Sequence, residues 1–272
     1  MVKLVPRKIQ EANWPEAYLQ TEEETKKYLR AVDELSLERA KDVLKRESNL
    51  FRVLFSNQIG IPTATIPELD LMWNTPEGRK ILRGHYEDSR EVCLRSADDS
   101  YSPNKPLAKK LAEEISYKKF KNPFILKGLE IQEDEGSKQY GLTLIPGDNF
   151  EIIEAPDFSA GNNQRQFISV NPDYSINWCE QGESGRTFYA KEGGILRVYL
   201  GRDGDLVSCW YDLGGSYCDG GVVSVRAEGT RAADLEDYVR DSKERAEKAY
   251  QQRLKILNSR REKALALLEG KE

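Results

Sequence analysis

The chain has 272 residues, of which 39% are hydrophobic and 32% are charged, and its net charge at pH 7 is -5. That length can bury the core of one large domain or of two small ones, and the acidic balance argues against a surface that binds nucleic acid all round. No apolar run approaches the roughly 20 residues of a membrane helix, and the apolar start is too short for a signal peptide. The sequence therefore predicts a soluble cytoplasmic protein without a membrane partner.

Residues 1–122 carry the patterns of a helical region. Thr21 and Glu24 have the spacing of a capping box, in which a hydroxyl and a carboxylate each accept a hydrogen bond from a free amide at a helix start. Apolar residues then recur at helical spacing, and Ser36 is placed to cap a second helix that ends at Gly60. The sequence thus predicts two helices joined at Ser36.

The rest of this zone is expected to mix loop and helix. The prolines within residues 61–75 predict an extended apolar loop packed over the core, because proline removes a backbone donor. Thr75 and Pro76 have the pattern of a helix start, and this helix is expected to carry Tyr86 on its apolar face. A further helix is predicted around Leu111.

From residue 123 to 229 the hydrophobic period changes to two, which indicates strands. The turns between these strands are rich in Gly, Asp and Asn and are too short to hold a crossover helix, so we expect an antiparallel meander. Asp203-Gly204 and Asp219-Gly220 each have the signature of a tight hairpin. The expected strands are 124–131, 140–145, 150–153, 166–170, 175–179, 186–190, 195–200, 206–211 and 222–226.

Residues 230–272 have the pattern of one long, charged, amphipathic helix. Its thin apolar stripe, from Leu235 to Leu268, has a spacing close to that of a coiled coil. We expect this helix either to dock on its own chain or to meet a protein partner or a second copy in a homo-oligomer. The whole sequence predicts an α+β fold with a helical N-terminal half, an antiparallel sheet and this terminal helix.

Few residues suggest a recognisable chemistry. His85 is the single histidine of the chain, and Asp88, three residues later, could orient its ring for general base catalysis. A histidine in the last turn of a helix is also explained by the helix dipole, which favours positive charge there. A zinc site built on two or more histidines is excluded, and we expect no cofactor and no metal.

Three turn carboxylates, Asp203, Asp205 and Asp219, could form the acid-base pair of a hydrolase or hold Ca²⁺. The further oxygen ligands of a calcium loop are missing, and an Asp in a turn commonly caps its own backbone. Residues 181–187 approach the pattern of a phosphate loop, but Arg186 stands where that motif needs lysine and a strand-like run follows it.

Two further groups of residues could bind a ligand. Trp178 and Trp210 could form a platform for sugar stacking, although their places in predicted strands favour core positions. Arg253, Arg260 and Lys263 could align on one face of the terminal helix and meet the phosphates of a nucleic acid, and a solvated helix face explains the same residues.

The four cysteines, Cys93, Cys179, Cys209 and Cys218, are far apart and include no C-x-x-C pair. We expect them to be reduced and partly buried. The alternative is that Cys209 and Cys218 face each other across neighbouring strands or join Cys179 at a metal.

Every catalytic constellation in the sequence is partial, so the sequence favours a non-enzymatic binding or assembly protein. Two alternatives stay open. One is a carboxylate-dependent hydrolase with its site at the sheet turns, and the other is a nucleic-acid-associated protein that uses the basic terminal helix.

Overall fold

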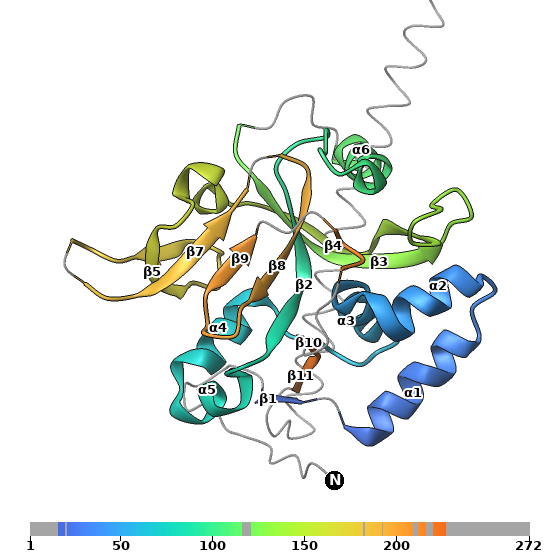
Figure 1. Ribbon diagram of the computed structural model, residues 1–272, viewed down its shortest axis with the longest axis horizontal. Helices are drawn as coiled ribbons and strands as arrows, with labels where there is room; N and C mark the ends of the chain where they lie inside the picture. Colours follow the sequence, from blue (N-terminus) through green and yellow to red (C-terminus); the bar gives the residue numbers. More distant parts are fainter. Residues whose placement is uncertain are drawn as a thin grey trace, which may run out of the picture. The chain divides into compact units, whose positions relative to one another are not determined.

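The computed structural model describes residues 16–19, 21–115, 121–181, 183–191, 193–208, 212–215 and 220–226. Within these residues the chain combines helices with a large, mostly antiparallel sheet, which confirms the expected α+β class (Figure 1). The expected helix over 230–272 lies outside the described residues. In the described part of the chain, no helix is long and apolar enough to cross a membrane.

The helices are short and most begin at a side-chain cap. Thr21 forms the expected capping box with Glu24, and Thr65 forms a second one with Glu68, each satisfying amides that the first turn leaves free. The helices are α1 (Glu22–Asp33), α2 (Glu38–Asp42), a π-helical turn (Val43–Glu47), α3 (Asn49–Gln58), α4 (Ile66–Asn74), α5 (Pro76–Leu82) and α6 (Lys105–Glu114).

The main sheet has the strand order β4-β3-β2-β8-β9-β7-β5-β6, with β10 beside β2. A separate two-stranded antiparallel sheet pairs β1 with β11. The strands are β1 (Glu16–Leu19), β2 (Tyr86–Leu94), β3 (Phe124–Glu133), β4 (Leu142–Glu154), β5 (Gln166–Val170), β6 (Ile176–Trp178), β7 (Arg186–Ala190), β8 (Ile195–Leu200), β9 (Leu206–Ser208), β10 (Gly220–Gly221) and β11 (Val223–Arg226).

The sheet is not the meander that the sequence predicted. Strand β2 comes from the N-terminal half and lies between β3 and β8, whereas β7 pairs with β9 in parallel. The second Asp-Gly signature was also wrong as a hairpin, because Gly220 and Gly221 form β10, parallel to β2. The short turns therefore indicated where strands lie in the sequence, but not which strands pair in the sheet.

Three helix predictions need correction. The helix expected from Ser36 to Gly60 is divided at Ser48, whose hydroxyl accepts a hydrogen bond from the amide of Phe51 and starts α3 anew. Residues 66–74, expected as loop, form α4, since proline is tolerated in the first turn of a helix. Helix α5 begins at Pro76 as expected but ends at Leu82, so Tyr86 opens a strand instead.

One strand prediction was also too fragmented. Residues 146–149, expected as a turn, lie inside the single strand β4, and the pairing of β4 with β3 is interrupted between Pro146 and Glu151. The extra residues of this irregularity belong to β4 and lie opposite Gly128 of β3, whose φ of 66° is a left-handed conformation that glycine adopts readily.

The central strands are covered on both faces. Val92 of β2 packs in a cluster with residues of α1, α3 and α6, whereas the next residue, Cys93, packs in a second cluster with residues of α4, β5 and β7. Ile195 and Leu196 of β8 divide between the two clusters in the same way, as expected for side chains that alternate along a strand. The second cluster, which includes Trp73, forms the base of the site described next.

Candidate ligand-binding cleft

A cleft of about 540 Å³ lies between the end of α4, helix α5, strand β5, the start of β7 and the turn between β8 and β9. This volume is in the range of small-molecule sites. We call it the arginine cleft, because three of its lining residues are arginines. The lining residues are Trp73, Asn74, Arg79, Arg83, Phe167, Ile168, Ser184, Gly185, Arg186 and Asp203.

The base of the cleft is aromatic and closed. Trp73 is 5% exposed and Phe167 is fully buried, so neither offers a ring face to a ligand. The guanidinium carbon of Arg186 lies 4.5 Å from the centre of the Phe167 ring, a cation-π contact. Gly204 packs so closely on Trp73 that a Cβ at this position would lie 2.1 Å from the indole. The rings therefore set the depth of the cleft.

A buried ion pair fixes the wall of the cleft. Arg186 Nη2 lies 2.5 Å from Asp70 Oδ1, and the same guanidinium donates to the carbonyls of Ile168 and Gly204. Asp70 Oδ2 accepts hydrogen bonds from the amide of Val170 at 2.9 Å and from Asn74 Nδ2 at 3.2 Å. Burial raises the pKa of Asp70, and the Arg186 charge opposes that shift. The pair neutralises Arg186 and ties α4 to β5 and β7.

The other two arginines are exposed to solvent. Thr75 caps α5 by accepting a hydrogen bond from the amide of Gly78, and the Arg83 amide still bonds to the Arg79 carbonyl at the helix end. Arg79 and Arg83 are thus one helical turn apart on one face. Arg79 Nε donates to the Trp73 carbonyl at 3.1 Å, and Arg79 is a lining residue of the cleft.

The β8-β9 hairpin contributes the one acidic lining residue of the cleft. Asp203 is exposed at its tip, as the Asp-Gly signature predicted. The Asp205 carboxylate accepts a hydrogen bond from the Thr187 amide at 2.9 Å, so it serves the pairing of the hairpin with β7. The Gly84 amide donates to the Arg202 carbonyl at 2.9 Å, which holds the tip against the turn after α5.

A second polar cluster lies inside the sheet on β2. Arg197 binds the Asp88 carboxylate through Nε at 2.8 Å and Nη2 at 2.5 Å, and Asn49 adds a hydrogen bond to the same carboxylate at 2.9 Å. Glu87 is 2% exposed, and its Oε2 has no hydrogen-bond partner. Burial and the neighbouring Asp88 charge raise the pKa of Glu87 to about 8. This cluster is buried and does not line the cleft.

Other residues that the sequence suggested are dispersed. His85 lies in a bend after α5, not in a helix, and the Asp88 that was expected to orient it is buried against Arg197. Trp178 is half-buried, as expected for a core-facing strand residue: it packs on Phe188, and its Nε1 donates to Asp157 at 3.0 Å. The remaining candidates, Asp219, Trp210, Arg253, Arg260 and Lys263, lie outside the described residues.

Two of the four cysteines can be placed. Cys93 is buried and Cys179 is half-buried, and both are free thiols. Cys209 and Cys218 lie outside the described residues. The described parts of the chain hold no group of three or more His, Cys, Asp or Glu side chains arranged to bind a metal ion. Arg186, which the sequence placed in a strand-like run after the phosphate-loop pattern, does begin β7.

Sequence reasoning missed the arginine cleft. Two signals could have indicated it: Thr65 and Glu68 have the spacing of a capping box, which places Asp70 on a helix, and Arg79 and Arg83 follow a Thr-Pro helix start at i,i+4 spacing. The partner of Asp70, Arg186, is 116 positions away in sequence. No local pattern could have paired them.

A scan of the sequence against protein-family models finds no match, and searches of curated proteins and of solved structures find none either. The function must therefore be argued from the geometry of the site.

Proposed function

We propose that the protein binds a small anionic ligand in the arginine cleft and does not transform it. The observation that carries this proposal is the state of the three arginines. Arg186 is neutralised by Asp70, whereas Arg79 and Arg83 are exposed side by side in the wall of the cleft. Two adjacent guanidinium groups offer several parallel donors, which is the geometry that binds carboxylates and phosphates well.

The end of helix α5 can carry this pair of charges. Positive charge in the last turn of a helix gains about 0.3–1 kcal/mol from the dipole, but like charges at i,i+4 lose about 0.2–0.5 kcal/mol. The dipole gain applies to each arginine and the repulsion applies once to the pair, so the helix end tolerates both charges. An anion bound between them would remove their repulsion and use the donors that the fold leaves free.

The lining residues favour binding over catalysis. Among them, Ser184 supplies the hydroxyl and Asp203 the carboxylate, and both are exposed. A paired-carboxylate hydrolase needs two carboxyl groups that flank the scissile bond, and the lining supplies one. A carboxylate-dependent hydrolase at the sheet turns is the alternative, and it would require Asp203 to act with a group on the ligand or outside the lining.

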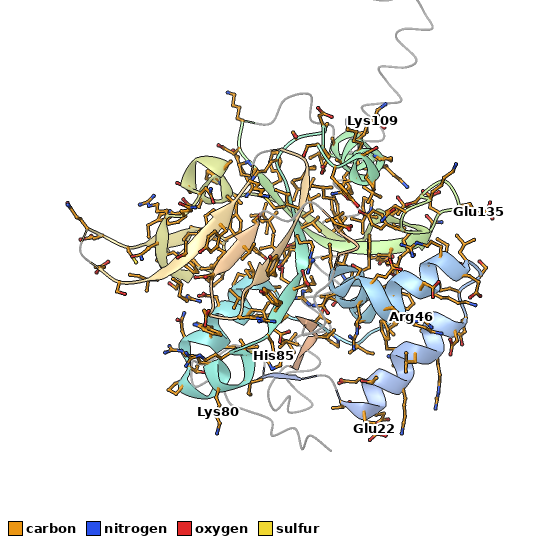
Figure 2. All side chains as sticks on the ribbon, viewed as in Figure 1. Glu22, Arg46, Lys80, His85, Lys109 and Glu135 are labelled. Atoms are coloured by element: carbon orange, nitrogen blue, oxygen red, sulfur yellow. The ribbon has the colours of Figure 1, made fainter. Side chains whose placement is uncertain are left out.

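Isothermal titration with inorganic phosphate and citrate tests the proposal. We expect at least one of these anions to bind with a Kd near or below 1 mM, and we expect the R79A/R83A variant to lose binding. The control is K80A, which removes a charge from the same helix (Figure 2) at a residue that does not line the cleft. Equal loss in K80A would indicate a diffuse charge effect, and absence of binding to the native chain would refute the proposal.

We also propose that the terminal segment mediates assembly in the cytoplasm. The support is the sequence pattern of 230–272, whose apolar stripe needs a surface to cover. Light scattering of the chain truncated before Thr230 tests this, because loss of a dimer or new aggregation is expected. Unchanged mass and stability would refute it and would favour the nucleic-acid alternative.

A further inference from the structure

The exposed lining of the arginine cleft also indicates the class of ligand, so this inference rests on the proposed function. The accessible side chains are mostly polar, and the aromatic rings lie closed at the base. Ile168, at 48% exposure, is the apolar lining residue that reaches solvent. An aromatic base or ring would find no free ring face on which to stack. A hydrophilic ligand fits this surface better.

The spacing of the arginines favours a phosphate over a carboxylate. Arg79 and Arg83 are connected by the hydrogen bond between the Arg83 amide and the Arg79 carbonyl, 2.9 Å long, so their side chains start about 5–6 Å apart at Cβ. A carboxylate has two oxygens and can accept two parallel hydrogen bonds from one guanidinium group. A phosphate monoester carries about −1.5 to −2 charges and three acceptor oxygens, so it can bind both guanidinium groups together.

Asp203 sets the orientation of such a ligand. Its carboxylate repels a phosphate and accepts hydrogen bonds, so the phosphate must lie at the arginines while donor groups turn toward Asp203. The hairpin tip is held near Arg83 by the bond from the Gly84 amide to the Arg202 carbonyl. Asn74 and Ser184 add groups that both donate and accept, which suits the hydroxyls of a polyol.

We propose that the ligand of the arginine cleft is a phosphate monoester of a small polyhydroxy molecule, such as a sugar phosphate. Arg79 and Arg83 bind the phosphate, and Asp203 accepts hydrogen bonds from the hydroxyls. Arg186 does not contact the phosphate, because Asp70 already occupies it. Its role is to hold the wall against which the ligand lies.

Titration calorimetry on the full chain tests this proposal with three probes: ribose 5-phosphate, ribose and inorganic phosphate. We expect ribose 5-phosphate to bind at least tenfold more tightly than either of the others. R79A and R83A should each weaken it at least tenfold, whereas K80A should leave it unchanged. Circular dichroism of each variant confirms that it is folded.

The decisive variant is D203N, which tests the binding of the hydroxyl end of the ligand separately from the binding of its phosphate. It should weaken ribose 5-phosphate several-fold while inorganic phosphate binds equally well or better, because a repelling charge is gone. A D203N variant that weakens neither probe would overturn the inference. If phosphate or citrate binds through Arg79 and Arg83 but ribose 5-phosphate binds no more tightly, the inference fails and the proposed function stands. If no probe binds, both fail.

Discussion

Arg186 and Asp70 show how a single pair of residues shapes the cleft. Both side chains are largely buried, at 13% and 2% exposure. Burying two charges costs desolvation energy that their attraction only partly offsets, so the pair itself adds little net stability. Removing one partner of the pair is strongly destabilising, because the remaining charge stays buried without a partner. The pair therefore favours one arrangement of α4, β5 and β7 over others.

Replacing Arg186 with leucine should destabilise the protein by about 3–5 kcal/mol at pH 7, since Asp70 would stay buried as an unpaired carboxylate. Urea denaturation measures this loss. The loss should be smaller at pH 5, because the unpaired carboxyl can then take up a proton. The D70N/R186L double variant removes both charges and should recover part of the stability. A loss below about 1 kcal/mol in R186L would show that water already reaches Asp70.

At the scale of elements, local sequence signals predicted where many helices and strands begin, but not which strands lie side by side. Strands β5, β7 and β8 lie where the period of two placed them, and α1 and α5 begin at their predicted caps. Strand β2 was missed because its inward residues include buried acids, among them Glu87 and Glu91, which hide the apolar alternation of a central strand. The hydrogen-bond donors to Glu91, which are Tyr174 and the Ile66 amide, are distant in sequence, so no local pattern could have identified them.

The candidate site was predictable only in its parts. Asp203 was identified as a hairpin residue, and it does stand at the tip of one. The arginines that surround it come from α5 and β7, which the sequence did not bring together. Tertiary packing determines where a cleft forms between a helix and two strands, and the amino-acid composition does not predict it.

The β8-β9 turn offers a direct test of how elements define the cleft. Gly204 has a φ of 80°, and a Cβ there would lie 2.1 Å from the Trp73 indole. We expect Gly204→Ala to cost roughly 2–5 kcal/mol, from the left-handed backbone and from overpacking. Gly84→Ala is the matched control, because its φ is 90° but nothing lies within 4 Å of its Cβ position. It should cost only about 1–2 kcal/mol in the same urea titration. Equal costs would mean that Trp73 moves aside freely.

At the scale of the whole molecule, the buried carboxyls give the protein a common pH response. Burial raises the pKa of Asp70, of Glu87 and of Glu91, and the Glu91 carboxylate also accepts hydrogen bonds from Tyr174 and the Ile66 amide. Each of these carboxyls keeps its proton to a higher pH in the folded protein than in the unfolded chain. Between the unfolded and the folded pKa of each group, folding takes up a proton, so the stability that this group contributes falls as the pH rises.

One substitution at Glu87 should remove a measurable share of this fall. The pKa of Glu87 is about 8 in the folded protein against 4.5 in the unfolded chain, so its contribution declines between those values, by at most about 1.4 kcal/mol per pH unit. Glu87→Gln imitates the protonated acid and should flatten the decline, which makes the variant more stable than the native chain at pH 8. Urea titrations at pH 5, 6, 7 and 8 measure both effects, with the exposed Glu135→Gln as control (Figure 2). If Glu87→Gln declines as steeply as the native chain, the Glu87 carboxyl must be ionised in the fold, and its unpartnered oxygen must meet water or a cation.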